Sequence, residues 1–294
     1  MDWRRTKTIF IGLLLLLNLF LSATLLYGNT TGSGRSEYEA YAGRILADRG
    51  ITYAGTWPDG PETAGMLRFE SALPNEEKLL ARLMPDARSR LREDGVREYA
   101  IGSRTLSIGK GTDGREEMVF DDPQAGYLLD GSEDAALRRS LADLFRAIGL
   151  GPFRLAADAE PVTDAAAAPT GAAEPVETVF VFMQPYRNGF LFDNRVTVVL
   201  QGGGIRRMSI RLHREQQMME PVGGGTGDVL SVRQALLLSP VRGPLEIQDV
   251  RFGWGQADAG ELYFSPMWRL RIADGRELRL DAYTGVLLST SEFR

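Results

Sequence analysis

The chain begins with an uncharged stretch that runs from Ile9 to Leu26 and consists mainly of Leu, Ile and Phe. At ~1.5 Å per residue, a helix of this length spans ~27 Å, close to the thickness of a bilayer's hydrocarbon core. The stretch is longer than the apolar region of a signal peptide, and Leu21 stands where cleavage requires a small residue. It therefore favours an uncleaved transmembrane helix over residues 9–27, rather than a cleaved signal or a buried soluble helix.

Basic residues lie before this stretch and not directly after it. Lys and Arg next to a span stay in the cytoplasm, so we expect a cytoplasmic flank at residues 1–8 and an extracytoplasmic C-terminal body. The sequence predicts a single-pass protein of the cell membrane in contact with the lipid bilayer. The residues that set this orientation are Trp3, Arg4, Arg5 and Lys7, with Tyr27 at the far interface.

Asn18 is the strongly polar residue near the middle of the expected span. Its amide has no water to bond in hydrocarbon, so we expect it to face a partner helix, with Leu14 and Ser22 one turn away on the same face. These three residues would form a transmembrane partner interface. The alternative is that the Asn18 amide bonds to the backbone of its own helix.

Charge and cysteine content narrow the function of the body. Without the N-terminal flank, 31 basic and 38 acidic residues remain, a net charge near −7, which argues against nucleic-acid binding. The chain contains no Cys, so zinc–thiolate sites, iron–sulfur clusters and disulfides are excluded. The body must be held together by its apolar core.

A change of composition divides the body. Residues 156–176, AADAEPVTDAAAAPTGAAEPV, have almost no large apolar residues and are predicted to form a linker. After a tether at residues 28–35, this leaves two extracytoplasmic subdomains, at residues 36–155 and 177–294.

The remaining pattern predicts an α+β fold in which helices alternate with groups of antiparallel strands. Helices are expected at residues 36–50 with Ser36 as N-cap, at 75–84 with Asn75 as N-cap, at 132–151 with Ser132 as N-cap, and at 227–240. Alternating segments separated by Gly-containing turns predict the strands, which fall at 51–57, 64–73, 97–111, 115–122, 177–214, 245–255 and 261–289.

Short motifs that could carry chemistry lack the rest of their sites. Ser107 and Lys110 have the spacing of the nucleophile motif in penicillin-binding enzymes, but that motif needs a helix N-terminus and here ends a strand. His213 is the only histidine, so it supports neither a catalytic triad nor a His-based metal site. A carboxylate pair for glycoside hydrolysis stays open, because it needs only two acids placed by the fold. We expect no catalytic residue, metal or cofactor.

The N-terminus resembles that of the YycI (WalI) family in its Met-Asp-Trp start, its Thr6-Lys7-Thr8-Ile9-Phe10 run and Asn18-Leu19-Phe20. The segment FMQPYRNGFLFDNRVTVVLQGGGI is similar to the strand pair that opens that family's C-terminal region. VRQAL and MWRLRIADGRELRLDAYTGVLL are similar to the helix and final hairpin of PepSY-like modules. The Arg- and Ala-rich composition and the long linker depart from the family's usual pattern.

This resemblance implies a non-enzymatic regulator of the YycFG (WalRK) two-component system of Gram-positive bacteria. Its partners would be a YycH-like protein and the sensor histidine kinase YycG (WalK), in control of cell-wall metabolism, and its subdomains would be similar to those of YycH. Other readings are an anchored wall hydrolase, a PepSY-type peptidase inhibitor, or a binder of a wall-derived small molecule. For such a binder, the aromatic segments VRFGWG and LYFSPMW would line the pocket unless they form core.

Overall fold

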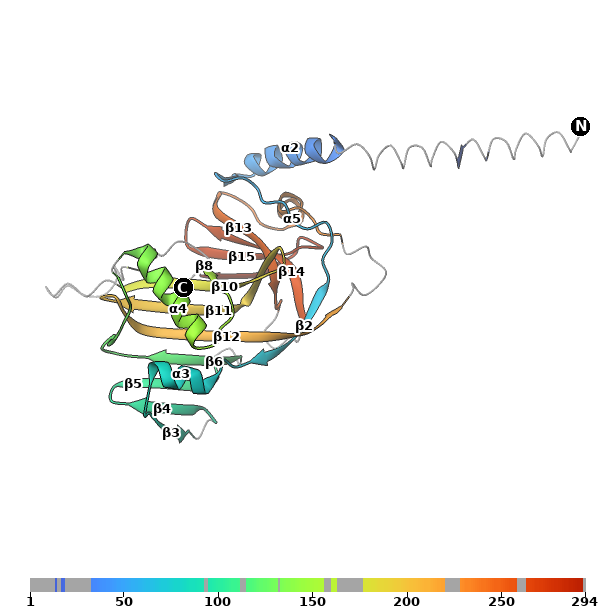
Figure 1. Cartoon of the computed structure of the whole chain (residues 1–294). Coiled ribbons are helices and arrows are strands. Elements are labelled where there is room, and N and C mark those ends of the chain that lie inside the picture. Colours follow the sequence, from blue (N-terminus) through green and yellow to red (C-terminus); the bar gives the residue numbers. More distant parts are fainter. Residues whose placement is uncertain are drawn as a thin grey trace, which may run out of the picture.

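The computed structural model describes residues 14, 17–18, 33–92, 95–111, 115–131, 133–155, 160–162, 177–219, 228–257 and 263–292. Within these residues the fold is α+β, with four helices beside one large, mainly antiparallel sheet (Figure 1). The helices are α2 (Ser33–Asp48), α3 (Glu76–Leu83), α4 (Asp134–Ala147) and α5 (Val232–Leu238). The strands are β1 (Ile51–Tyr53), β2 (Met66–Ala72), β3 (Arg88–Leu91), β4 (Arg97–Ile101), β5 (Arg104–Lys110), β6 (Glu116–Asp121), β7 (Tyr127–Leu128), β8 (Arg154–Leu155), β9 (Glu160–Val162), β10 (Glu177–Tyr186), β11 (Gly189–Gln201), β12 (Gly204–Met219), β13 (Leu245–Gly255), β14 (Tyr263–Ile272), β15 (Arg276–Asp281) and β16 (Leu287–Glu292).

The sheet follows the strand order β3-β4-β5-β6-β12-β2-β14-β13-β11-β10-β8, and β12 also pairs with β11. Hydrogen-bonded pairings therefore connect β11, β12, β2, β14 and β13 in a closed circuit. The long strand β12 makes this possible: its first half pairs with β11 and β6, and its second half pairs with β2.

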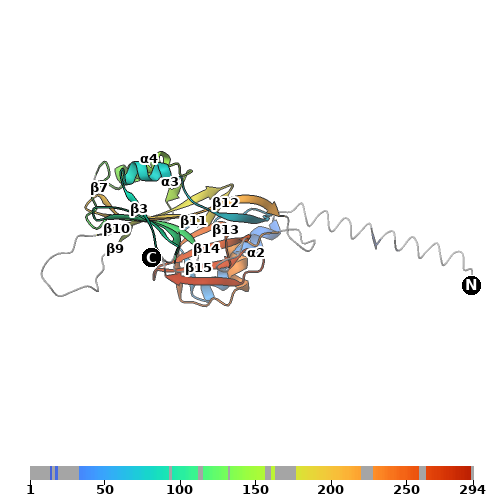
Figure 2. The same cartoon turned by 90° about the horizontal axis from the view of Figure 1, so that it is seen from below.

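Two large apolar cores lie on opposite sides of this arrangement, and a third, small cluster contains Val181, Met183, Phe192 and Met267. In the first core, α3 and α4 cover one face of β4, β5, β6, β10, β11 and β12, and Leu141 and Phe120 are fully enclosed there. In the second core, α2 and α5 pack with β1, β2, β13, β14 and β15 around Trp268. Figure 2 shows α3 and α4 on one side of the strands and α2 toward the other.

The second core joins parts of the chain that are far apart in sequence. It contains Leu46 of α2 and Phe69 of β2 together with residues of α5 and β13–β15. Strand pairs β1–β13, β2–β12 and β6–β12 likewise connect residues before and after the predicted linker. The predicted division at residues 156–176 therefore does not coincide with a break in the sheet, because composition detects a core-free segment but not long-range pairing. Within that segment, β9 pairs with β10.

The sequence predicted the start of one helix correctly and the start of another incorrectly. The predicted cap of α3 is confirmed, because the Asn75 side chain accepts a hydrogen bond from the Lys78 backbone N–H at 2.9 Å. The prediction for the first helix was wrong at its start: α2 begins at Ser33, before the expected cap at Ser36. Along this helix, Ala42 is buried but Tyr41 is 55% exposed, because only part of the helix meets α5.

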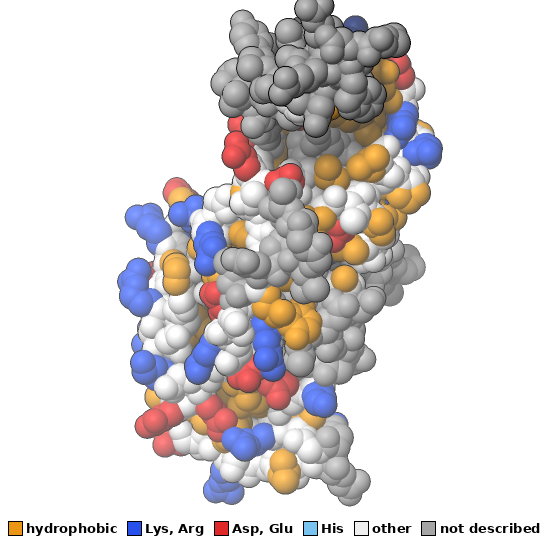
Figure 3. Space-filling model, turned by 90° about the vertical axis from the view of Figure 1, so that its right-hand side faces the viewer, with side chains coloured by type: hydrophobic (Ala, Val, Ile, Leu, Met, Phe, Trp, Pro, Cys, Tyr) orange, Lys and Arg blue, Asp and Glu red, His pale blue; other side chains and the backbone are white. Residues whose placement is uncertain are grey.

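The expected span at residues 9–27 lies outside the described residues except for Leu14, Leu17 and Asn18, which are helical. Among the described residues, no helix has the length and apolar character needed to cross a membrane. On the face of the molecule seen in Figure 3, basic and acidic side chains are interspersed over the part that is not grey.

Candidate functional site

The residues predicted for the transmembrane interface are described only in part. The Asn18 side-chain N–H donates to the Leu14 backbone carbonyl at 3.0 Å, which is the self-bonded arrangement that the sequence left open. Ser22 lies outside the described residues, as do the predicted orientation residues Trp3, Arg4, Arg5 and Lys7. The interface with a partner helix stays a prediction.

The first long helix after the expected span is fixed to the C-terminal part of the body. Arg233 of α5 forms an ion pair with Glu39 of α2 at 3.3 Å and donates to the Glu39 backbone carbonyl at 2.8 Å. Arg49, just beyond α2, donates to the Leu237 backbone carbonyl at 3.1 Å. With Leu46 buried beneath the helix, we call these α2–α5 contacts the clamp.

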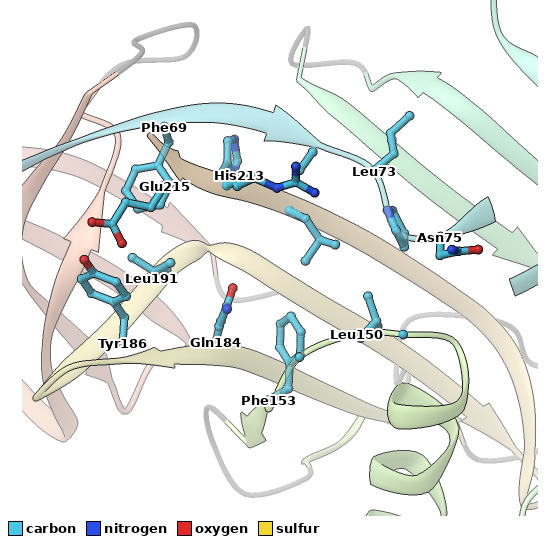
Figure 4. A pocket seen from close by; sticks show the side chains of 16 residues that line it. Phe69, Leu73, Asn75, Leu150, Phe153, Gln184, Tyr186, Leu191, His213 and Glu215 are labelled. Atoms are coloured by element: carbon cyan, nitrogen blue, oxygen red, sulfur yellow. The ribbon is translucent and has the colours of Figure 1, made fainter. Parts of the chain in front are cut away.

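A pocket of about 520 Å³ opens between β2, β10, β12 and the segment that follows α4. Figure 4 shows Tyr186 and Glu215 at one end, Gln184 and His213 in the middle, and Leu73, Leu150 and Phe153 toward the other end. The complete lining is Phe69, Ala72, Leu73, Pro74, Asn75, Gly149, Leu150, Gly151, Phe153, Gln184, Tyr186, Leu191, Leu212, His213, Arg214 and Glu215.

Asn194 holds the middle of this pocket in place. It is fully buried, and its amide oxygen accepts from the His213 backbone N–H at 2.7 Å. Its amide N–H groups donate to the His213 carbonyl at 2.9 Å and to the Gln184 side-chain oxygen at 2.6 Å. The side chain thus replaces a neighbouring strand at the point where β12 leaves β11. A buried amide with this many partners is a positioning element.

The His213 imidazole is part of that framework. Its Nδ1 lies 3.0 Å from the Asn194 side-chain oxygen, and its ring meets Phe264 edge-on at 5.0 Å. Burial lowers the pKa of His213, so the ring is neutral near pH 7. These contacts fit the structural role expected for this histidine.

The Tyr186 phenol forms the polar end of the pocket. Its ring meets Trp254 edge-on at 5.3 Å, and its buried hydroxyl has no hydrogen-bond partner among the described residues. Burial and the neighbouring Glu215 carboxylate raise the pKa of Tyr186 to about 12, so the phenol stays protonated.

The pocket combines titratable and apolar side chains. Its titratable side chains are Tyr186, His213, Arg214 and Glu215. Its volume is in the range of small-molecule sites, but its lining exposes more polar than apolar surface, whereas such sites are mostly apolar. Within the described part of the chain, no group of three or more His, Cys, Asp or Glu is placed to hold a metal ion.

A second polar cluster, which we call the charged layer, connects β11 with β14 and β15. The buried Asp193 carboxylate pairs with Arg115 and Arg279, each at 3.2 Å, and accepts from the Gln256 backbone N–H at 2.7 Å. Glu277 pairs with Arg269 at 2.7 Å and with Arg279 at 2.9 Å. Burial alone would raise the pKa of Asp193 and of Glu277, but the adjacent guanidinium groups outweigh it and hold both below their usual values.

Sequence reasoning missed the residues that organise both clusters. Asp193 and Asn194 are consecutive polar residues inside an apolar strand, FLFDNRV, and that interruption was the available signal. The segments VRFGWG and LYFSPMW supply core instead of pocket: Trp254, Phe264 and Trp268 are buried in the second core. Ser107 and Lys110 both lie in β5, as the strand interpretation expected.

Comparison with known proteins adds little. No family model and no curated protein matches the chain. Among solved structures, an uncharacterized protein from Eubacterium rectale ATCC 33656 is 11% identical, with a TM-score of 0.46 and with coverage of 83% of this chain and 91% of that chain. A similarity of this degree carries no argument about fold or function.

Proposed function

We propose that this protein is a non-enzymatic, membrane-anchored regulator of a sensor histidine kinase of the YycG (WalK) type. It would act with a YycH-like partner in the control of cell-wall metabolism, through extracytoplasmic parts similar to PepSY modules and to YycH. The N-terminal sequence resemblance to the YycI family supports this proposal. The proposed topology is a cytoplasmic N-terminus, one span and an extracytoplasmic body.

The structural observation that carries the proposal is the clamp between α2 and α5. Only residues 28–32 separate the end of the expected span from Ser33, the first residue of α2. Glu39 and Leu46 then fix α2 to the second core through Arg233 and apolar packing. A shift of the anchor against the spans of its partners would therefore be transmitted to the body. A change in the body would likewise be transmitted to the anchor. Coupling of this kind is what a regulator without catalytic chemistry requires.

The test separates the association of this protein with the kinase from the transmission of a signal through the clamp. In the full-length protein, Arg233→Met removes both contacts to Glu39 while keeping a long apolar side chain, and Arg233→Lys restores the charge. We expect Arg233→Met to keep membrane co-purification with the kinase, which the span supports, but to change target-gene output several-fold. Arg68→Met, at an exposed arginine of β2, is the matched control and should leave both unchanged.

Asn18→Leu tests the expected contact between the span and the transmembrane helices of its partners. Interhelical hydrogen bonds in membranes are worth only ~0.6–2 kcal/mol, so this change should weaken co-purification without abolishing it. The proposal fails if the protein co-purifies with neither the kinase nor the YycH-like partner. It also fails if output is unchanged both in Arg233→Met and after exchange of the span for an unrelated anchor.

The pocket beside His213 supports a second candidate function, the binding of a small wall-derived ligand. Its volume and mixed lining are the relevant observations. Enlarging a side chain at its partly open wall, as in Ala72→Phe, would then remove ligand-dependent output while the clamp and the co-purification stay intact. A response that survives this change would reject the pocket as the ligand site.

A further inference from the structure

Arg195 of β11 has no anionic partner among the residues that the structure describes. It is partly buried, and among the described residues its guanidinium has no ion pair or hydrogen bond. Its cross-strand neighbours on the same face are Arg211 of β12 and Met183 of β10. A partly buried charge with no partner is costly, and like charges opposite each other on a sheet add to that cost.

The acid whose charge favours the protonated form of Arg195 is already engaged. Glu277 holds Arg269 and Arg279 with its two oxygens at 2.7 and 2.9 Å. Arg211 is paired with Glu117 at 3.1 Å. Burial, the largest cause, and the neighbouring Arg211, Arg279 and Arg269 lower the pKa of Arg195, while Glu277 raises it.

A neighbouring hydroxyl also lacks an acceptor. Thr197 lies two residues further along β11, so it shares the face of Arg195, and its buried side-chain oxygen has no hydrogen-bond partner in the described structure. Ser209 lies directly across from Thr197 on β12. This part of the strand pair therefore places the Arg195 guanidinium and an unbonded hydroxyl on one face.

We propose that Arg195, assisted by the Thr197 hydroxyl, binds a tetrahedral oxyanion, a phosphoryl or sulfate group. A guanidinium presents its N–H donors in a fixed fork that suits such oxygens, and charge-assisted hydrogen bonds of this type are stronger than neutral ones. Arg195 is only partly buried, so part of its side chain is open to solvent. The site lies in the charged layer, apart from the pocket lined by His213, and the proposal does not depend on kinase regulation.

The experiment uses the full chain in nanodiscs of zwitterionic lipid. Thermal unfolding is followed with low-millimolar inorganic phosphate or sulfate, and with chloride at the same ionic strength. At about ten times the dissociation constant, phosphate should raise Tm by about 3 °C in the wild type. Arg195→Met should lose that rise. It should also be at least as stable as the wild type in chloride, because an unpaired charge has been removed.

Two further variants and one spectroscopic readout make the result decisive. Thr197→Val should reduce the phosphate-dependent rise in Tm, and Arg68→Met, a charge change at an exposed site on β2, should leave it intact. The ³¹P signal of phosphate should broaden with the wild type and not with Arg195→Met. Nanodiscs that contain anionic lipid distinguish the sources: a lipid headgroup at the site would abolish the response to free phosphate. Equal responses of wild type and Arg195→Met, or no broadening with the wild type, would overturn the proposal.

Discussion

The two faces of the strand pair β11–β12 carry side chains of different character, although they alternate along the same two strands. Toward α3 and α4, the strands present apolar side chains such as Val196, Val198 and Ile210, all buried in the first core. Toward β14 and β15, the alternate positions carry Asp193, Arg195 and Arg211. One face is held by burial of apolar surface, whereas the other combines the ion pairs of the charged layer with a small apolar cluster around Phe192.

The difference matters because the two faces tolerate change differently. An apolar face needs only side chains of suitable volume, and many combinations supply them. A buried ion pair repays its desolvation only when every partner is in place, so the loss of one partner leaves an uncompensated charge. We therefore expect the apolar face to contribute more to stability. We expect the charged layer to tolerate fewer substitutions.

The largest expected effect is on the apolar face. Phe120→Ala removes an aromatic ring that is 1% exposed in the first core, and it should lower the free energy of unfolding by about 3–5 kcal/mol. Urea unfolding monitored by circular dichroism measures the loss. Phe120→Leu should restore most of it, since it refills much of the volume. A loss below ~1 kcal/mol for the alanine variant would mean that the first core is loosely packed.

A substitution in the charged layer should lower the free energy of unfolding somewhat less, although it changes the side-chain volume much less. Asp193→Asn keeps the volume but leaves Arg115 and Arg279 without their shared carboxylate. Breaking a buried pair in this way should cost about 3 kcal/mol. The control is Asp274→Asn, which breaks an exposed pair with Arg276 and should cost far less, because solvent screens exposed ion pairs. Equal losses for the two variants would show that the charged layer is solvated.

Local sequence signals predicted the parts of this fold that depend on neighbours in the chain. The stripe Leu137, Leu141, Leu144 and Phe145 placed α4, and Asn75 placed the start of α3. Turn residues placed the hairpin between β14 and β15, where Gly275 adopts a positive φ of 85°. Each of these features depends on a few consecutive residues, which is why the sequence predicted it.

Pairing between distant segments could not be read in the same way. Nothing in ITYAG indicates that Ile51 pairs with Leu245 in a parallel bridge, and nothing in MLRFESA selects β12 as its partner. The partner of a strand depends on which apolar faces must be buried together, and that is a property of the whole chain. The candidate sites depend on the same pairings, so the roles of Asn194 and Asp193 became visible only in the structure.

The smallest effect expected within this comparison is a dependence on pH that belongs to the charged layer alone. Asp193 and Glu277 have pKa values below their usual range because of Arg115, Arg269 and Arg279. For a carboxylate whose folded-state pKa is lowered, the stabilising contribution is fully present above the unfolded-state pKa near 4. It is lost as the pH falls toward the folded-state pKa.

Each such group contributes a slope of at most about 1.4 kcal/mol per pH unit in that window, so we expect a loss of roughly 2 kcal/mol between pH 5 and pH 3 from the two together. Urea unfolding at several pH values measures this loss. Asp193→Asn should be less stable at pH 6 but show a shallower decline toward pH 3, whereas Phe120→Ala should keep the full wild-type slope. If Phe120→Ala flattened the curve as much as Asp193→Asn, the two faces would not be the separate sources of stability that their residues indicate.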